Sequence, residues 1–332
     1  MSSLINIFNN DAFTLMSLTA AINKMPHKPG RIGSLGLFQS EGITTDVAVI
    51  EELDGSIALV QTSQPGAPAA TVGGDKRKVR SFVVPHLKKE STILPQHVQG
   101  VRAFGSENAT EGVQAVVAQR QAKLKGDLDV TLERHRVGAI KGLVLDADDS
   151  TLFNLFTEFG VSQQTAEIDL NSDGEEIRRR CVEIQRLSEN ELGAEAVTGY
   201  RAFCGDTFFD QLVEHPDVKE SLKYQESQTL RKDLRKGFEY GGITFENYRG
   251  SVNGTKFFAD AECFVVPEGT GIFITRYAPA KFLDTVNTVG LPYYSRVAID
   301  PQMQEWAKVH AQSNPLNLCT RPRAVIKVVQ GS

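Results

Sequence analysis

The sequence predicts an α+β fold organised around one long helix. Apolar residues recur at mostly helical spacing through 108–148, with charged residues between them. A two-stranded pattern precedes this stretch, and the segment 224–332 is rich in short strand patterns. Helices and strands are therefore segregated along the chain, which is typical of the α+β class. The apolar stripe of the long helix consists of Val113, Val117, Leu124, Leu128, Leu132, Val137, Ile140 and Val144.

This long helix, the spine helix, is predicted from Thr110 to Asp146. Asn108-Ala-Thr-Glu111 supplies an N-cap pattern with an acidic residue in the first turn. One continuous helix over this range would be roughly 55 Å long at about 1.5 Å per residue. Three glycines weaken it, so an ordinary amphipathic helix broken near Gly126 stays open as the alternative.

The N-terminal part predicts an arm. Asp11 can cap a short helix over 12–23, which Pro26 ends. Such an arm packs either on its own domain or on a neighbouring subunit. The glycine-punctuated stretch 29–42 fits neither a P-loop nor a dinucleotide fingerprint, and it predicts a turn.

Residues 43–90 predict a long two-stranded excursion. Residues 45–51 alternate as a strand does, Asp54-Gly55 carries the hairpin signal, and Ile57–Thr62 is the expected return strand. A Pro/Gly/Ala-rich stretch follows, and Ser81–Val84 resumes a strand. An isolated hairpin is only marginally stable in water, and no nearby segment of the sequence is predicted to form a second layer over it. We therefore expect another subunit to complete this part of the fold.

Two basic clusters are candidate interface sites. The first cluster, within residues 76–80, fits a solvated loop tip, with contact to nucleic acid or an acidic partner as the alternative. The second lies on a helix predicted from Asp173 to Leu192, and fits a solvated or interface face better than a phosphate site. The clusters are Lys76, Arg77, Lys78 and Arg80, and Arg178, Arg179 and Arg180.

The rest of the chain predicts a compact α/β lobe followed by strands. The lobe contains a strand over 197–203 and two short helices, the second starting at Pro216. Gly241-Gly242 marks a hairpin, and the chain ends directly after a last predicted strand that should be tied into a sheet. Further strands are expected at 263–266, 272–277, 293–299, 306–312, 316–319 and 324–329.

Composition excludes several classes of function. The net charge is −5, so the chain has no overall basic character that would suggest nucleic-acid binding. The four cysteines are far apart without a C-x-x-C, which predicts buried thiols in a reducing compartment. No apolar run reaches the roughly 18 residues of a membrane span, and no secretory signal is recognisable.

No catalytic or metal-binding pattern is present in the sequence. The six histidines lack ligand spacing, and no cysteine has a protease signature. His135 stands among charges on the spine helix and is expected to be exposed. We therefore predict no enzyme activity, no cofactor and no metal site.

Motifs along nearly the whole chain resemble one family in the family's own order. Pro29-Gly30-x-Ile-Gly-x-Leu-Gly-Leu-Phe38 and Gly42-x-Thr-Thr45 open the series, and Val98-Gln-Gly-Val-Arg-Ala-Phe-Gly105 precedes the spine helix. The series continues with Gly237-Phe-Glu-Tyr-Gly-Gly-Ile-Thr-Phe-Glu-Asn-Tyr-Arg249, Pro267-Glu-Gly269, Tyr277-Ala-Pro279, Val286-Asn-Thr-x-Gly-x-Pro-Tyr293, Gln312-Ser-Asn-Pro-Leu316 and Arg321-Pro322. Together they are similar to the lambda-type phage major capsid proteins, the capsid protein E family.

This resemblance implies the tailed-phage major capsid fold of the HK-ninety-seven type. Residues 1–42 would form the N-terminal arm and 43–95 the extended E-loop. Residues 96–149 would form the peripheral domain with the spine helix, 150–285 the axial domain near the five- and six-fold axes, and 286–332 the return to the peripheral domain. Neither Lys76 nor Lys78 can be paired with a cross-linking residue, so non-covalent assembly is expected.

The implied function is a shell subunit that assembles as hexamers and pentamers into an icosahedral head around double-stranded DNA. The expected partners are copies of itself, with scaffold, head protease, portal and decoration proteins, and only weak contact with packaged DNA. The expected location is the virion capsid, assembled in the host cytoplasm, without a membrane. The alternatives are an encapsulin-like shell around protein cargo, or a nucleic-acid-binding or phosphate-handling enzyme that uses the basic clusters.

Overall fold

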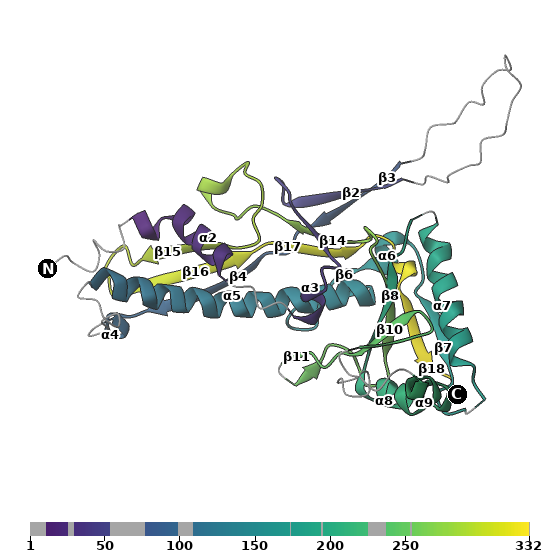
Figure 1. Cartoon of the computed structure of the whole chain (residues 1–332). Coiled ribbons are helices and arrows are strands. Elements are labelled where there is room, and N and C mark those ends of the chain that lie inside the picture. The colour runs from purple at the N-terminus through teal and green to yellow at the C-terminus, as the bar shows by residue number, and fades with distance from the viewer. Residues whose placement is uncertain are drawn as a thin grey trace, which may run out of the picture.

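The computed structural model consists of an elongated body and a lobe at one end of it (Figure 1). The body is built along the spine helix, and the lobe extends away from the C-terminal end of that helix. The structure describes residues 11–25, 30–53, 77–98, 109–172, 174–193, 195–224, 237–252 and 254–331.

The spine helix, α5 (Ala109–Lys141), is one unbroken helix of 33 residues, about 50 Å long at 1.5 Å per residue. It passes Gly126 without a break, so the single-helix prediction is confirmed. It ends earlier than expected, because Gly142 adopts a left-handed φ of 78°. Val144 therefore lies in β5 (Leu143–Leu145), and the predicted cap at Asn108 lies outside the described residues.

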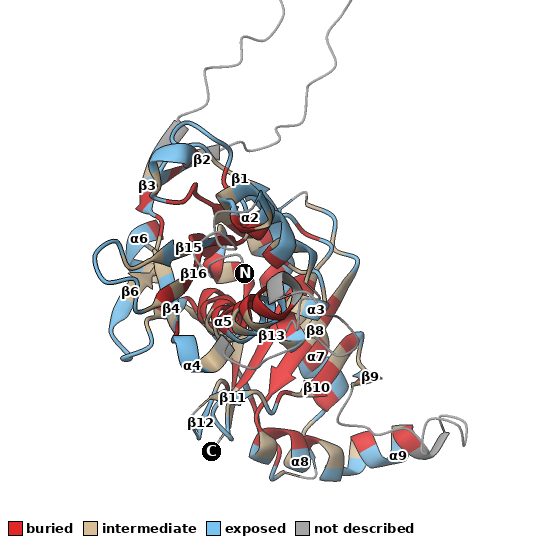
Figure 2. Ribbon diagram, turned by 90° about the vertical axis from the view of Figure 1, so that its left-hand side faces the viewer, coloured by how far each residue is buried: buried red, intermediate tan, exposed pale blue. Residues whose placement is uncertain are grey.

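The predicted apolar stripe is buried along its whole length. Figure 2, viewed along the body, shows α5 as a largely buried element surrounded by the rest of the body. Two three-stranded sheets lie along it, in the orders β15-β16-β4 and β1-β14-β17. Their strands are β4 (Leu87–Ile93), β15 (Tyr294–Ile299), β16 (Ala307–Ser313), β1 (Gln39–Gly42), β14 (Phe273–Tyr277) and β17 (Pro315–Cys319), and α4 (Pro95–Val98) follows β4.

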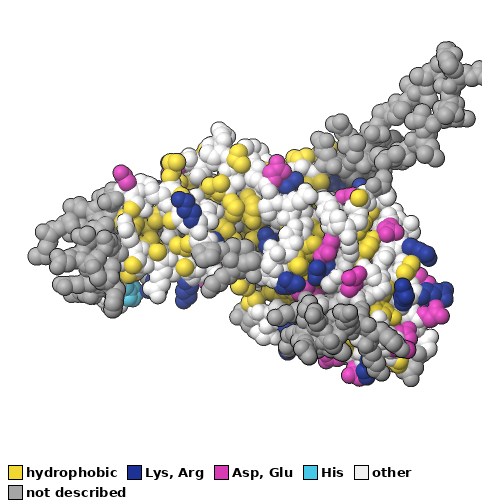
Figure 3. Space-filling view, viewed as in Figure 1, with side chains coloured by type: hydrophobic (Ala, Val, Ile, Leu, Met, Phe, Trp, Pro, Cys, Tyr) yellow, Lys and Arg dark blue, Asp and Glu magenta, His cyan; other side chains and the backbone are white. Residues whose placement is uncertain are grey.

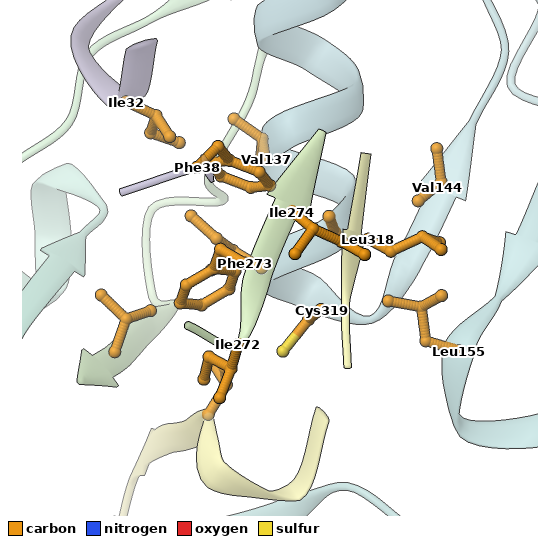
Figure 4. Close-up of a cluster of buried hydrophobic side chains, with 14 of the residues drawn as sticks. Ile32, Phe38, Val137, Val144, Leu155, Ile272, Phe273, Ile274, Leu318 and Cys319 are labelled. Atoms are coloured by element: carbon orange, nitrogen blue, oxygen red, sulfur yellow. The ribbon is translucent and has the colours of Figure 1, made fainter. Parts of the chain in front are cut away.

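The largest core forms where the C-terminal half of α5 meets β14 and β17. Figure 4 shows Val137 of α5 facing Phe38 and Phe273, whose ring centroids are 5.2 Å apart. Leu155, which begins α6 (Leu155–Phe159) after the β5–β6 pair, joins the same core. β6 spans Thr151–Asn154.

The lobe is a six-stranded mixed sheet in the order β7-β18-β13-β8-β10-β9. Helix α7 (Ile177–Leu192) buries Ile177, Cys181 and Ile184 in the lobe core. Helices α8 (Asp206–Glu214) and α9 (Pro216–Tyr224) lie at the far end of the lobe (Figure 1), and β11 (Ser251–Val252) pairs with β12 (Thr255–Lys256). The sheet strands are β7 (Gln164–Ile168), β18 (Ile326–Gln330), β13 (Cys263–Glu268), β8 (Gly199–Cys204), β10 (Ile243–Asn247) and β9 (Phe238–Tyr240).

The sheets of the structure cross two of the expected segment boundaries. β18 lies between β7 and β13 in the lobe, although the expected return to the peripheral domain covers residues 286–332. β14 lies in a body sheet, although the expected axial domain extends to residue 285. Strand partners come from distant parts of the chain, so boundaries drawn along the sequence cannot follow them. The predicted lobe helices and the Gly241-Gly242 hairpin are confirmed.

The N-terminal arm packs on its own chain. A 3-10 turn (Asp11–Phe13) leads into α2 (Leu15–Lys24), which Thr14 caps by accepting a hydrogen bond from the Ser17 backbone N–H. Leu18 and Ile22 of α2 are buried against α5 and β15. This structure therefore favours the first of the two alternatives for the arm.

A polar stripe on a buried face of α5 fastens this arm. Gln121, Lys125, Asp129 and Glu133 recur every fourth residue, and each is at most 4% exposed. The Lys125 ammonium donates to the Ile22 carbonyl at 3.1 Å and to the Met25 carbonyl at 2.7 Å. The Asp129 carboxylate accepts a hydrogen bond from the Tyr293 hydroxyl. Burial lowers the pKa of Lys125, which Asp129 partly offsets.

Glu133 joins the arm, the spine helix and the lobe. Its two carboxylate oxygens accept hydrogen bonds from the backbone N–H groups of Ile32 (2.7 Å) and Gly33 (3.0 Å), in α3 (Arg31–Ser34). The Tyr248 hydroxyl donates to the same carboxylate at 2.9 Å. A Cβ at Gly30 would overlap the Glu133 side chain, so this close approach requires glycine.

An ion-pair network continues from the arm into the lobe sheet. The Arg31 guanidinium pairs with Glu246 at 2.5 Å, and Arg201 pairs with the same carboxylate at 3.2 Å. Arg201 also pairs with Glu268 at 2.5 Å. The Glu246 side chain is only 5% exposed, so solvent screens this network weakly. The orientation of the lobe therefore depends on charges contributed by the arm.

One sequence prediction on the spine helix is wrong. His135 is 1% exposed, and its Nε2 has no hydrogen-bond partner in the described part of the chain. Burial lowers its pKa to about 4, with Arg134 acting in the same direction and Asp146 opposing it. Its charged neighbours in the sequence point elsewhere, because a helix separates adjacent side chains by about 100°.

The apolar stripe is predicted to be essential for folding. Leu128→Asp would place an unpaired charge at a site that is 5% exposed, at a cost of several kcal/mol against a net stability of about 5–15 kcal/mol. We expect insoluble or unfolded protein. Val130→Asp is the matched control, because Val130 lies one half-turn away and is 44% exposed. Soluble expression and circular dichroism measure both, and equal behaviour of the two variants would contradict the assignment.

The buried His135 predicts acid sensitivity. The unfolded chain binds a proton near pH 6.5 and the folded chain only near pH 4, so stability falls as pH drops through this window. The full effect is about 3 kcal/mol below pH 4, at 1.36 kcal/mol per pKa unit. Urea denaturation between pH 7 and pH 4 should show a smaller loss for His135→Leu than for wild type. An identical pH dependence would show that His135 does not contribute.

Candidate assembly surfaces

A two-stranded ribbon projects from the body next to the lobe (Figure 1). It pairs β2 (Val47–Leu53) with β3 (Arg77–Val83) in antiparallel register, from Val47 opposite Val83 to Leu53 opposite Arg77. The strand expected at Ser81–Val84 is confirmed up to Val83. The expected turn at Asp54-Gly55 and return strand at Ile57–Thr62 lie outside the described residues, and the partner that the structure gives β2 is β3.

The chain itself covers the inner face of this ribbon. Ala48, Phe82 and Val84 are buried in the body core. The Phe82 ring lies 5.8 Å from the ring of Phe153 and 6.1 Å from that of Phe159. The expectation that no part of the chain covers the hairpin is therefore wrong for this face, which the aromatic residues around α6 pack against.

Arg80 anchors the ribbon to the end of α6. Its guanidinium donates to the backbone carbonyls of Glu158 and of Phe159, the latter at 3.2 Å, and lies 5.0 Å from the centre of the Phe159 ring. Carbonyls at a helix C-terminus carry partial negative charge and favour a cation. The loop-tip interpretation of this cluster is therefore wrong for Arg80, which lies in β3. Lys76 is outside the described residues, and only the backbone of Arg77 and Lys78 is described.

The outer face of the ribbon presents four exposed valines. Val47 and Val83 are opposite one another and are 37% and 67% exposed. Val49 is 60% exposed and Val79 is 62% exposed on the same face. A β-branched apolar face in water favours association with another surface. This face is the first candidate assembly surface.

The second candidate assembly surface is the loop over residues 279–292, between β14 and β15. Four of its apolar side chains are exposed, namely Leu283, Val286, Val289 and Leu291. Figure 3 shows hydrophobic side chains gathered over the body, whereas charged side chains of both signs concentrate on the lobe.

Buried polar groups hold this loop in place. The Asn314 side-chain amide donates to the Pro279 carbonyl at 2.7 Å, and the Ser313 hydroxyl donates to the Pro292 carbonyl at 2.6 Å. The Gly290 backbone N–H donates to the Ile43 carbonyl at 2.9 Å, which connects the loop to the start of the ribbon. The apolar side chains are thus presented by a fixed backbone, so little ordering entropy would be lost when a partner covers them.

The arginines Arg178, Arg179 and Arg180 are exposed in the first turn of α7. Arg179 pairs with Glu183 at 3.2 Å, and Arg180 pairs with Glu175 and, at 3.0 Å, with Glu183. The hydrogen bond from Arg180 lowers the pKa of the Glu183 carboxyl. Arg178 has no ion pair within the described ranges. Two of the three charges are therefore already balanced by carboxylates of the same chain.

The glutamates that line one cavity among the described residues are already paired. This cavity, of about 280 Å³, lies between the arm, α5 and β10, and Glu133 and Glu246 in its wall have the partners described above. Among the residues that the structure describes, no group of three histidine, cysteine or carboxylate side chains is placed to hold a metal ion. No helix among the described residues is long and apolar enough to cross a membrane.

Comparison with known proteins gives one consistent family. A family model described as phage major capsid protein E matches residues 14–330. The major capsid protein of Pseudomonas phage KPP10 is 28% identical, over 98% of this chain and 99% of that protein. The major capsid protein of Salmonella phage Felix O1 is 26% identical, over 95% of this chain and 96% of that protein.

Solved structures share the fold at low sequence identity. A putative capsid protein of a prophage from E. coli CFT073 has a TM-score of 0.59 at 14% identity, over 94% of this chain and 97% of that one. The capsid of a native GTA particle has a TM-score of 0.52 at 9% identity, with 89% of each chain covered. At such identities the likeness concerns the fold alone.

Removing the Arg80 guanidinium is predicted to loosen the ribbon. Arg80→Met keeps the apolar stem but loses the charged hydrogen bonds to the end of α6, at a cost of about 1–3 kcal/mol. We expect amide exchange in β2 and β3 to accelerate roughly tenfold or more. Hydrogen-exchange mass spectrometry measures this, with Arg178→Met as the control. Unchanged exchange in Arg80→Met would contradict the anchoring role.

Proposed function

The chain belongs to the phage major capsid protein E family, and from that premise we propose that it is the shell subunit of an icosahedral phage head. The family and the tailed-phage capsid fold expected from the sequence are both confirmed. In this proposal, copies of the chain assemble as hexamers and pentamers into a closed shell around double-stranded DNA. The two apolar surfaces on rigid supports are the observation that carries it.

The outer face of the ribbon is the proposed E-loop contact with a neighbouring subunit. Its inner face is occupied by the chain's own core, so only the valine face is available to a partner. A contact between two different patches repeats head to tail and closes into a ring when the rotation allows. The loop over residues 279–292 is a second patch that is exposed, apolar and fixed, as such a contact requires. Obligate interfaces of this kind bury more than about 2,000 Å².

The remaining roles of the protein follow from this proposal. A shell subunit acts through its interfaces, so we propose no enzyme activity. Scaffold, head protease, portal and decoration proteins are the proposed partners besides other copies, and assembly is proposed to take place in the host cytoplasm. Non-covalent assembly remains part of the proposal. The segment names used for the arm, E-loop, peripheral domain and axial domain are proposals as well.

Particle formation is the first test of this function. Purified protein should form closed particles visible by negative-stain electron microscopy. Val79→Asp should give folded subunits that fail to assemble, because the residue is 62% exposed on the outer face of the ribbon. Val79→Ile is the matched control and should assemble. Particles of normal yield from Val79→Asp would remove the ribbon from the interface, and absence of particles from wild type under all assembly conditions would count against the function itself.

Genome contact is proposed to be weak, and the arginines of α7 are proposed to serve subunit interfaces. Phosphate contacts fall steeply with salt, and the net charge of −5 opposes them further. Arg179→Glu should therefore reduce particle yield in sedimentation without changing duplex binding in a gel shift. Submicromolar duplex binding by wild type at physiological salt, abolished by Arg179→Glu while shells still form, would instead favour a nucleic-acid-binding protein. DNA or protein inside the particles distinguishes a phage head from a cargo shell.

A further inference from the structure

Two cysteines face one another at the ends of the two middle strands of the lobe sheet. Cys204 is the last residue of β8 and Cys263 the first of β13, and the strand register places them directly opposite. Their sulfur atoms are 3.4 Å apart, and both residues are completely buried. All four cysteines of the chain are free thiols, as the sequence predicted.

The backbone around this pair suits a cross-strand disulfide. The Gly205 backbone N–H donates to the Glu262 carbonyl, one residue further along each strand. In an antiparallel ladder the hydrogen-bonded and non-hydrogen-bonded pairs alternate, so Cys204 and Cys263 form a non-hydrogen-bonded pair. The Cα atoms of such a pair are about 4.5 Å apart, which lies within the range that disulfides span. A bond therefore needs only side-chain adjustment.

The pair stands at the stem of a long excursion of the chain. Residues 205–262 leave β8 and return to β13, and they carry α8, α9, β9, β10, β11 and β12. Non-covalent contacts also close this stem, since Lys256 pairs with Asp206 at 2.7 Å, and Glu262 pairs with Lys141 at 2.7 Å. A covalent link here would join both ends of the far part of the lobe. Closing a loop of this length restricts the unfolded chain strongly.

We propose that Cys204 and Cys263 are a redox latch that closes the stem of the lobe when the protein meets an oxidising medium. With a peroxide as oxidant, one thiolate attacks the O–O bond, which gives a sulfenic acid and hydroxide. The second thiol then displaces the sulfenic oxygen as water and forms the S–S bond. In total, two thiols and one hydrogen peroxide give one disulfide and two waters.

Burial makes this latch slow and selective. It raises the pKa of the Cys263 thiol well above its ordinary value, and the thiolate is the reactive form. Oxidation therefore requires local opening of the lobe. In a reducing cytoplasm, with the lobe closed, both thiols stay reduced. In so far as the proposed function holds, the latch closes after the head leaves the reducing host for an oxidising exterior.

The other cysteines provide matched controls. Cys319 lies in the body core, and burial raises its pKa to about 12. Cys181 lies on α7 in the same lobe core as the pair, and burial likewise raises its pKa to about 12. Both are as buried as the pair, but Cys319 lies opposite Phe273 in the strand register and Cys181 lies on a helix. Burial alone therefore cannot account for a link that is specific to Cys204 and Cys263.

The test uses unassembled full-length protein, so its outcome does not depend on shell formation. Protein exposed to hydrogen peroxide and then blocked with an alkylating reagent is digested without reductant and mapped by mass spectrometry. We expect one cross-linked peptide pair containing Cys204 and Cys263, and a melting temperature several degrees above that of the reduced protein. Dithiothreitol should reverse both changes.

Variants separate the latch from general oxidation. Cys181→Ala and Cys319→Ala should keep the link and the thermal shift, whereas Cys204→Ala should lose both. If Cys204→Ala does not fold, the peptide map of wild type still decides the matter. The proposal is overturned by a link that involves Cys181, by oxidation that stops at sulfinic acid, or by thiols that remain free after incubation near the melting temperature.

Discussion

The structure depends on buried charges of the spine helix that must each find a partner. Lys125, Asp129 and Glu133 lie inside the body, where an unpaired charge would cost more than the fold can tolerate. Their partners come from elsewhere in the chain, namely the carbonyls at the end of α2, the Tyr293 hydroxyl, and the N–H groups of α3 with Tyr248. The contacts that compensate these buried charges therefore also fix the positions of the arm and of the start of β15.

The same requirement extends to the lobe. Glu133 also accepts from Tyr248, and Arg31 of the arm shares Glu246 with Arg201 of β8. The arm thus lies between the spine helix and the lobe sheet and contributes charge to both. Because Glu133 and Glu246 are buried, removing a partner leaves a buried carboxylate less well compensated, which favours one relative arrangement of the body and the lobe.

A rigid subunit presents its exposed apolar surfaces in the same arrangement in every copy, which a flexible subunit could not do. Arg80 holds the ribbon against α6, and Asn314 and Ser313 hold the loop over residues 279–292. In both places polar contacts within the chain hold the backbone, and the exposed large apolar side chains are valine and leucine. Polar contacts within the chain set the shape of the subunit, and exposed apolar side chains can contact neighbouring subunits. This arrangement suits a protein that acts by association.

The sequence by itself determined the family, the spine helix, the lobe helices and the buried thiols. Those features depend on local periodicity, turn chemistry and motifs, as the stripe from Val113 to Ile140 illustrates. Only the tertiary structure decided that His135 and Lys125 are buried, that β2 pairs with β3, that Arg80 binds the end of α6, and that β18 joins the lobe sheet. The physical reason is that burial of a polar residue and pairing of a strand depend on partners far away in the chain. No local pattern encodes the position of those partners.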